Sequence, residues 1–291
     1  MNMKRLKSIG MVICFYGKLP WYFDYFVHSC GYNPTVDFYV VTDNFSYNKS
    51  LPLNVKLIFK PLEELKELIN TKLGFDTNIT NAYKLCDFKP AYGHIFSELL
   101  VGYDIWGHCD IDLVFGDIRG FMNDDILDQY DIISSRPDWI PGCFLLFKNT
   151  SKMNLLYTHS KDYKKVFSSN VHYCFDETNF THRQFEEEKP FNEIKSEIES
   201  MMHVVKKMES CGYIKPYFDM HIIEGGSPGR LRWENGTLIY KNRFEVLLYH
   251  LIDFKRHFVP PKRDPQIKET FTISQKYIYN GRKTGLKTIT S

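Results

Sequence analysis

The chain has 291 residues, of which 43% are hydrophobic and 16% aromatic, and its formal net charge is +2. This length supports one large α/β domain or two small ones, and the near-neutral charge gives no indication of nucleic-acid binding. The seven cysteines are odd in number, are spread along the chain and form no C-x-x-C pair. We therefore expect reduced thiols in a cytoplasmic protein and neither a disulfide framework nor a zinc site.

The first elements alternate between strand and helix. Residues 9–16 are predicted to form a strand and not a signal peptide, because the apolar run is short and no small-residue cleavage site follows it. No apolar stretch is long enough to span a membrane. Further elements are expected as a helix at 21–30, strands at 37–42 and 55–59, and a helix at 61–70. This alternation predicts a largely parallel sheet.

The rest of the chain continues the α/β pattern. A helix is expected over 81–100, in which Pro90 produces a kink or starts a second helix. A hairpin is expected with its turn at Asn235–Gly236. The remaining elements are predicted as strands at 105–115, 132–133 and 142–147 and helices at 154–169 and 191–208.

Two acids interrupt the predicted strand 105–115. Side chains two residues apart in a strand point to the same side, so Asp110 and Asp112 are expected to project together beside the buried Leu113. Two buried carboxylates without partners are costly, and a hard divalent ion such as Mg²⁺ or Mn²⁺ is their usual partner. A bare D-x-D is more often a pair of solvated acids at a strand end. The choice between a metal site and solvated acids therefore depends on motifs elsewhere in the chain.

Four further blocks accompany D-I-D. They are A-Y-K-L at 82–85, P-G-C-F-L-L-F-K-N at 141–149, F-D-E-T-N at 175–179 and H-L-I-D-F-K at 250–255. With these blocks in this order, the chain resembles a GT-A fold glycosyltransferase. It is most similar to the family-8 type, which includes glycogenin and lipopolysaccharide galactosyltransferases, and also resembles a bacterial family of uncharacterised glycosyltransferase-like proteins. The resemblance implies an α/β, Rossmann-like GT-A fold with a mixed, mostly parallel sheet flanked by helices.

The resemblance also implies a set of donor-binding residues. Asp110, Asp112 and His250 would hold Mn²⁺ or Mg²⁺; without D-I-D, His250 would be read as a core histidine. A basic residue near the diphosphate and a pocket for the nucleotide sugar are implied as well. The residues expected in these roles are Tyr16, Gly17, Thr42, Asp43, Lys84, Asp87 and Lys255. The interval from His250 to Lys255 is one residue shorter than in the family, which puts the role of Lys255 in question.

Asp176 and Glu177 are the expected catalytic residues. They lie in the block that resembles the family's segment beside the reacting sugar, where Glu177 replaces the usual Gln. A carboxylate there could act as a general base in an inverting enzyme, or support an oxocarbenium-like centre in a retaining one. The resemblance favours retention.

The sequence therefore predicts a metal-dependent glycosyltransferase. It would move a hexose from a nucleotide sugar, expected to be a UDP-sugar, to a glycan or lipid-linked acceptor, as in bacterial surface polysaccharide synthesis. Two alternatives stay open: a nucleotidyltransferase acting on sugar phosphates, and a non-catalytic carbohydrate-binding protein with a degenerate transferase fold. Neither a nucleic-acid partner nor a membrane span is expected.

The C-terminal segment differs in composition from the rest. From Lys255 onward there are nine Lys and Arg residues against two acids, with aromatic residues between them. We therefore predict a transferase domain at 1–255 and a basic, aromatic tail at 256–291. The tail is predicted to contact an anionic membrane peripherally, on its inner face. A solvated tail, or one folded back over the sheet, is the open alternative.

Overall fold

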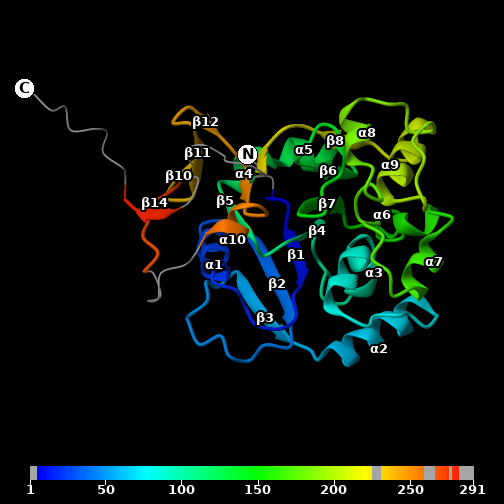
Figure 1. Ribbon diagram of the computed structural model, residues 1–291, viewed down its shortest axis with the longest axis horizontal. Coiled ribbons are helices and arrows are strands. Elements are labelled where there is room, and N and C mark those ends of the chain that lie inside the picture. The colour runs from blue at the N-terminus through cyan, green and yellow to red at the C-terminus, as the bar shows by residue number, and fades with distance from the viewer. Residues whose placement is uncertain (1–4, 225–230, 259–265, 275–276, 282–291) are drawn as a thin grey trace, which may run out of the picture.

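The structure is a computed structural model that describes residues 5–224, 231–258, 266–274 and 277–281 (Figure 1). A seven-stranded sheet in the order β3-β2-β1-β4-β7-β6-β8 forms its centre. Of these strands only β7 runs antiparallel to its neighbours. The strands are β1 (Ile9–Cys14), β2 (Val36–Thr42), β3 (Val55–Phe59), β4 (Ile105–Cys109), β6 (Ile132–Ser134), β7 (Phe144–Lys148) and β8 (Pro216–Phe218). The predicted fold class, a mixed, mostly parallel sheet flanked by helices, is confirmed.

Both faces of this sheet are covered by helices, because successive side chains of its strands point to opposite sides. In β1, Met11 and Ile13 belong to one hydrophobic core and Val12 to the other. The first core lies under α1 (Phe23–Gly31), α4 (Ile118–Phe121) and α5 (Asp124–Gln129). The second lies under α2 (Leu62–Leu73), η1 (Ala82–Ala91), α3 (Tyr92–Ile95), α6 (Ser151–Asn154), η2 (Leu156–His159), α7 (Tyr163–Ser168) and α9 (Met201–Ser210).

Several predicted helices are shorter than expected. The helix predicted over 81–100 is instead the 3₁₀-helix η1 followed by the short α3, with the backbone N–H of Lys84 capped by the Asn81 side chain. Pro90 lies inside η1 and donates no backbone hydrogen bond. The helices predicted over 154–169 and 191–208 are likewise wrong in extent. Only short helices form in the first range, and in the second the helix begins at Met201 and ends at Ser210.

The strand predicted over 105–115 is broken at the two acids. β4 ends at Cys109, and β5 (Leu113–Phe115) leaves the central sheet to join a three-stranded sheet in the order β5-β13-β9. The last backbone hydrogen bond before the break joins the Asp110 N–H to the Cys143 carbonyl, at 3.0 Å. The expectation that both acids share one strand face is therefore wrong, because neither lies in a strand. The partners of β5 are β13 (Leu248–His250) and β9 (Ile222–Glu224).

A five-stranded sheet in the order β12-β11-β10-β14-β15 completes the described fold. Its hairpin has Asn235 and Gly236 at positive φ (48° and 88°), which confirms the predicted turn. Its strands are β10 (Leu231–Glu234), β11 (Thr237–Tyr240), β12 (Phe244–Glu245), β14 (Thr270–Ile273) and β15 (Ile278–Asn280). β14 and β15 lie within the segment predicted as a tail, so this part of it is folded onto the sheet through the pairing of β14 with β10.

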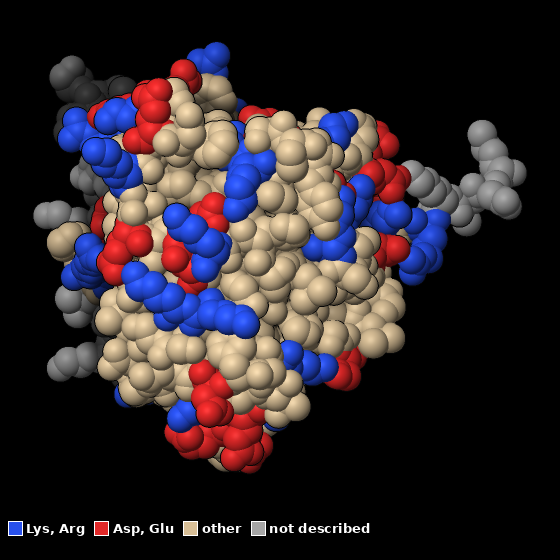
Figure 2. Space-filling model, turned by 90° about the vertical axis from the view of Figure 1, so that its right-hand side faces the viewer, with Lys and Arg blue, Asp and Glu red and all other residues tan. Residues whose placement is uncertain are grey.

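The surface on the side of α7 and α9 carries both charge signs. Lys and Arg side chains are interspersed with Asp and Glu around a broad uncharged area (Figure 2). Among the described residues, no helix has both the length and the apolar character needed to cross a bilayer. Two short helices complete the described elements, α8 (His182–Glu186) and α10 (Phe254–His257).

Candidate active site

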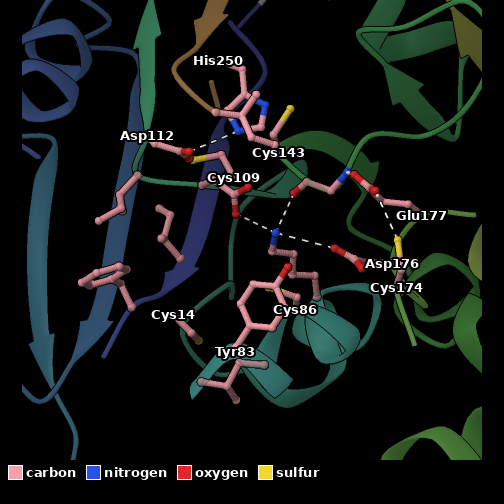
Figure 3. Close-up of a pocket in the computed structure, with 18 of the residues that line it drawn as sticks. Cys14, Tyr83, Cys86, Cys109, Asp112, Cys143, Cys174, Asp176, Glu177 and His250 are labelled. Atoms are coloured by element: carbon pink, nitrogen blue, oxygen red, sulfur yellow. Dashed lines mark hydrogen bonds and ion pairs between the residues drawn. The ribbon is translucent and has the colours of Figure 1, made fainter. Parts of the chain in front are cut away.

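A cleft of about 700 Å³ opens at the carboxyl ends of β1 and β4 (Figure 3). Ligands of open α/β sheets bind at this edge of the sheet. The cleft is lined by residues 13–16, at and just after the end of β1. It is also lined by residues 109–112, at and just after the end of β4. Gly142 and Cys143 lie just before the antiparallel β7 and therefore reach the same edge.

Asp110, Asp112 and His250 come together on one wall of this cleft. Each offers a ligand atom, and these atoms all lie within 4.8 Å of one another. The register of β13 and β5 explains the arrangement, since His250 pairs with Leu113, the residue after Asp112. Two segments far apart in the sequence thus place an imidazole beside two carboxylates.

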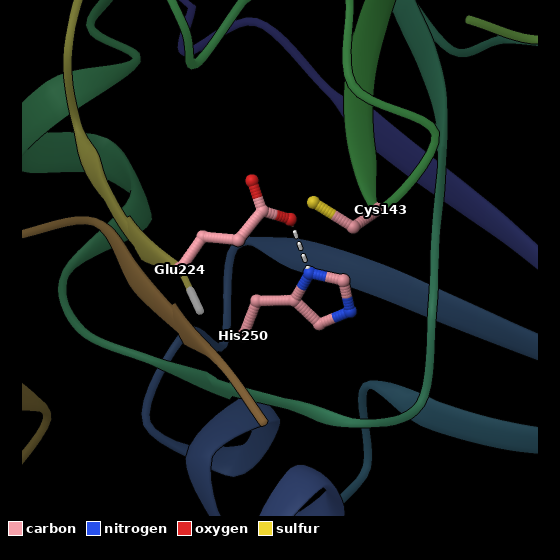
Figure 4. Close-up of side chains that lie close together, drawn as sticks. All are labelled: Cys143, Glu224 and His250. Atoms are coloured by element: carbon pink, nitrogen blue, oxygen red, sulfur yellow. Dashed lines mark hydrogen bonds and ion pairs between the residues drawn. The ribbon is translucent and has the colours of Figure 1, made fainter. Parts of the chain in front are cut away.

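His250 is held by contacts at both ring nitrogens. Its Nδ1 lies 2.6 Å from Oε1 of Glu224 (Figure 4). Its Nε2 lies 3.3 Å from Oδ2 of Asp112 (Figure 3). Glu224 ends β9, which pairs with β13 so that Glu224 stands beside His250. A carboxylate on the far nitrogen is the usual way in which a metal-binding histidine is oriented, with the near nitrogen left for the ion. Glu224 was not predicted, since no local motif distinguishes it.

Two lysines balance the carboxylates. Nζ of Lys255 lies 2.5 Å from Oδ2 of Asp112, and Nζ of Lys89 lies 2.6 Å from Oδ1 of Asp110. Burial alone would raise the pKa of Asp112, but His250 and Lys255 outweigh it and hold that pKa below its ordinary value. Burial would lower the pKa of Lys89, yet Asp110 and neighbouring groups raise it well above its ordinary value.

The donor set of this wall fits a hard or borderline divalent ion. Two carboxylates and one imidazole match Mn²⁺ or Mg²⁺, and the contact with Glu224 fixes the imidazole. Lys255 reaches the same carboxylate as His250 despite the shortened interval between them. The residues present therefore fit the ion that the sequence motifs imply.

Asp176 and Glu177 lie across the cleft from His250 (Figure 3). Oδ2 of Asp176 is 3.6 Å from Nζ of Lys89, while its buried Oδ1 has no hydrogen-bond partner. Oε1 of Glu177 accepts a 2.6 Å bond from the backbone N–H of Gly142, and its Oε2 lies 2.7 Å from Nε2 of His182.

The environments of these two neighbouring acids drive their pKa values apart. Burial raises the pKa of Asp176 well above its ordinary value, more than the nearby Lys89 lowers it. Burial acts on Glu177 in the same direction, but His182 and the Gly142 N–H outweigh it and lower the pKa of Glu177 to about 2. Such a separation is typical of paired carboxyl groups with different roles.

Gly142 lies between the two walls, where any side chain would force the two acids to shift. A Cβ atom there would be 2.4 Å from Oδ2 of Asp176 and 3.0 Å from Oε1 of Glu177. Its N–H binds Glu177, and its carbonyl accepts a 2.9 Å bond from Nζ of Lys89. The backbone of Gly142 thus contacts both an acid, Glu177, and a lysine, Lys89, of the cleft.

Lys84 and Asp87 are not in the cleft, in contrast to the prediction that they contact the donor. Both side chains are fully buried, with Nζ of Lys84 2.8 Å from Oδ2 of Asp87. Lys84 also donates to the carbonyls of Val166 and Val171. Asp87 accepts from backbone N–H groups of the segment that leads to Asp176. Lys89 is the lysine of η1 that lines the cleft.

The four residues predicted around the nucleotide lie at the end of β2 and in the loops that follow β1 and β2. Tyr16 lines the cleft, where its buried hydroxyl has no hydrogen-bond partner. Gly17 donates its N–H to Oδ1 of Asp43 at 2.8 Å and has φ +92°. Thr42 is buried and accepts from the Asn44 N–H. These contacts join the ends of β1 and β2, and only Tyr16 of the four is among the residues that line the cleft.

Several other residues that line the cleft were not predicted as site residues. Tyr83 and Phe180 are 67% and 63% exposed, although both are large aromatic residues. His172 packs between their rings, with ring centroids at 4.7 Å and 5.7 Å. Trp139 is also in the lining. High aromatic content was evident from composition, but Phe180 and Trp139 lie in irregular segments that have no repeating pattern.

A protein-family model described as "Family of unknown function (DUF6625)" matches residues 11–281. No curated protein matches the chain. Similar solved structures include the galactosyltransferase LgtC in complex with donor and acceptor sugar analogs, with 13% identity, a TM-score of 0.35, and 55% of this chain and 66% of that chain covered.

Two other solved structures are similar to the chain. GlyE, a glycosyltransferase of Streptococcus pneumoniae, has 10% identity and a TM-score of 0.36, with 74% of this chain and 46% of that chain covered. Mouse xyloside xylosyltransferase 1 has 10% identity and a TM-score of 0.44, with 84% and 97% covered. The chain thus spans about two thirds of LgtC and about half of GlyE. All three are glycosyltransferases, the class that the motifs resemble. Because each TM-score is below 0.5, the proposals below rest on the residues of the site.

Proposed function

We propose that this chain, which belongs to the DUF6625 family, is a metal-dependent GT-A glycosyltransferase that moves a hexose from a nucleotide sugar, with a UDP-sugar as the expected donor. The convergence of Asp110, Asp112 and His250 carries the proposal, because their ligand atoms lie within 4.8 Å of one another in a cleft that also contains a separate acid pair. A diphosphate leaving group needs a cation, and these residues are suited to hold one.

The donor end would act by neutralising charge. A bound Mn²⁺ or Mg²⁺ would offset the negative charge that develops on the departing diphosphate. Asp110, Asp112 and His250 would hold the ion. Lys255 and Lys89, which now contact the two carboxylates, would then be within reach of diphosphate oxygens.

The reaction end would act through Asp176 and Glu177. With its pKa lowered to about 2, Glu177 is ionised at neutral pH and is a weak base. This favours an electrostatic role, in which Glu177 supports positive charge at the reacting carbon, and so supports retention. Asp176, with its raised pKa and its unpartnered Oδ1, would hydrogen-bond a sugar hydroxyl.

The rim of the cleft supports a glycan acceptor. The exposed rings of Tyr83 and Phe180 are available to pack on the apolar face of a sugar. Phe180 is held at φ +61°, which is uncommon for a bulky residue and often marks a functional position. A glycan or lipid-linked acceptor of a surface polysaccharide would carry such a face.

Contact with an anionic membrane remains a prediction. Six of the nine basic residues from Lys255 onward (Lys262, Arg263, Lys276, Arg282, Lys283 and Lys287) lie outside the described residues. Of the other three, Lys255 contacts Asp112, while Arg256 and Lys268 are exposed.

Calorimetry and product analysis test the proposal. UDP is expected to bind much more tightly with Mn²⁺ than without it, and incubation with a UDP-sugar and an acceptor should release UDP. Release of pyrophosphate from a sugar phosphate and UTP would instead identify a nucleotidyltransferase. Sugar binding with neither nucleotide affinity nor turnover would identify a carbohydrate-binding protein.

A further inference from the structure

Three side chains with metal-binding atoms converge within residues 174–182, on the reaction side of the cleft. Sγ of Cys174 lies 3.3 Å from Oε2 of Glu177 (Figure 3). Nε2 of His182 lies 2.7 Å from the same oxygen. Sγ and Nε2 are 3.9 Å apart. One thiol, one carboxylate oxygen and one imidazole nitrogen thus point at a common centre.

The separations of these atoms suit a tetrahedral ion. With Zn–S of about 2.3 Å and Zn–N and Zn–O of about 2.0 Å, tetrahedral ligand atoms are roughly 3.3–3.5 Å apart. The observed separations of 2.7, 3.3 and 3.9 Å lie on both sides of this range. Shifts of about half an ångström would therefore admit the ion.

The backbone that presents these side chains is unusual. Cys174, Asn179 and Phe180 all have positive φ, at 51°, 55° and 61°. The segment is closed by a 3.0 Å bond from the Asn179 N–H to the Cys174 carbonyl. The Asn179 side chain fixes it further through the Tyr173 carbonyl and the Glu197 N–H. Such costly conformations persist only where the surroundings enforce them, and they cluster at functional sites.

The ligand atoms are also oriented from behind. Gly142 binds Oε1 of Glu177 and so directs Oε2 toward the other two ligands. The ring of His182 packs edge-on against Trp139, with the centroids 4.5 Å apart. Contacts that orient the ligand side chains in this way are typical of metal sites.

The donor chemistry differs from that of the first wall. A site with two carboxylates and an imidazole suits Mn²⁺ or Mg²⁺, whereas a thiolate with an imidazole and one carboxylate suits Zn²⁺. A nucleophilic role for Cys174 fits less well. Burial raises the pKa of its thiol, and Glu177 is closer to the imidazole than Cys174 is.

We propose that Cys174, Glu177 and His182 form a second metal site, for a thiophilic divalent ion of the Zn²⁺ class, separate from Asp110, Asp112 and His250. Binding would exchange the thiol proton of Cys174 for the ion and release that proton to solvent. Three protein ligands leave a fourth position, which water or a substrate oxygen would fill. Because the ion would occupy Glu177, a loaded site is expected to inhibit transfer.

This site was not expected from the sequence, where the absence of C-x-x-C argued against zinc. The ligands follow the pattern C-x₂-E-x₄-H, which contains a single cysteine. A search for cysteine pairs does not detect it. Its existence does not depend on the proposed transferase activity, and neither does the following test.

Cobalt absorption provides a direct readout. One equivalent of Co²⁺ added to the reduced full-length protein should produce a thiolate-to-cobalt band in the near ultraviolet, together with the visible bands of a tetrahedral ion. Zn²⁺ should bleach these bands. C174S and H182N should lose them, and the Zn²⁺ affinity of each variant should fall at least about tenfold by calorimetry. D112N, in which the first wall is altered, should retain them.

The matched control is C143S. Cys143 lies near Glu224 and His250 and forms with them another group that could hold an ion (Figure 4). Bands lost in C143S and kept in C174S would assign the ion to that group and overturn the proposal, as would their absence from the wild-type protein. Circular dichroism of each metal-free variant checks folding. If C174S is unfolded, H182N alone decides between the two outcomes.

Discussion

Asp112 lies in the cleft between two basic side chains. It is 5% exposed and meets both His250 and Lys255. We predict that D112N removes the Mn²⁺-dependent part of UDP binding, because a neutral amide is a poor ligand for a hard cation. Calorimetry with and without Mn²⁺ measures this part directly. D117N is the matched control, since Asp117 lies just past the other end of β5, is exposed and does not line the cleft. Unchanged binding by D112N would refute the assignment of the first wall.

Glu177 is predicted to matter for turnover and not for nucleotide affinity. The amide oxygen of Gln in E177Q can still accept the Gly142 N–H, but the negative charge is lost. We expect kcat to fall by about 10²–10³-fold with little change in UDP affinity, because the lost interaction acts mainly in the transition state. Initial rates and UDP calorimetry on the same preparation separate the two effects. A variant with full turnover on its acceptor would exclude the role.

The sequence predicted which acids and which histidine meet in the cleft, but it did not predict the orientation of every side chain. Asp110, Asp112 and His250 lie in one cleft with Asp176 and Glu177, as the order of the motifs implied. Lys84 and Asp87 do not, because both are turned into the core. A motif gives the type of a residue, but whether a lysine of η1 points inward or into the cleft depends on packing against segments far away in the sequence.

At the scale of elements, the Lys84–Asp87 pair joins η1 to residues 171–175. Replacing Lys84 by Met would leave the buried Asp87 carboxylate without its ammonium partner. We predict that K84M lowers the free energy of unfolding by about 3–5 kcal/mol, as measured by urea denaturation. K66M is the control, since Lys66 forms only an exposed pair with Glu63, which is worth at most about 1 kcal/mol. Equal stabilities of the two variants would contradict the structural role.

The same pair gives a pH dependence. Burial would raise the pKa of Asp87, but His172 and Lys84 outweigh it and lower that pKa below its ordinary 3.8. A carboxyl group with a depressed pKa stabilises the fold above its ordinary pKa and loses this contribution as the pH falls through the folded-state value. The stability difference between wild type and D87N should therefore be constant near neutral pH and shrink below about pH 3.8. Urea unfolding from pH 7 to pH 3 measures it, and a constant difference would rule out this contribution.

The elements were predictable where the pattern was local. The strands at 37–42 and 55–59 and the hairpin turn at Asn235–Gly236 follow from apolar runs and from turn chemistry. The break in 105–115 was not predictable, because β5 leaves the central sheet to pair with β13, a strand more than a hundred residues later. The helices at 81–100 and 154–169 are shortened for a related reason. Their apolar residues pack into a core shared with distant segments, and short helices are enough to bury them there.

For the whole molecule, β14 makes part of the C-terminal segment integral to the fold. Phe271 is fully buried and stacks on Trp233, with the ring centroids 5.0 Å apart. We predict that F271A lowers the free energy of unfolding by about 3–5 kcal/mol, whereas L53A, at a residue that is 99% exposed, has little effect. Thermal and urea unfolding test this difference. A fully stable F271A would mean that this sheet is not needed for the fold. Tests of membrane contact should therefore neutralise basic residues and keep the chain length.

The pairing of Lys255 with Asp112 and of Lys89 with Asp110 has a consequence for the order of events in the cleft. Each ammonium group competes with a divalent ion for the same carboxylate oxygen. An ion that binds without nucleotide therefore has to displace the two lysines from these carboxylates. A diphosphate offers those lysines another anion and thereby releases the carboxylates. Ion and nucleotide should consequently bind with positive heterotropic cooperativity, each raising the affinity of the other by the same factor.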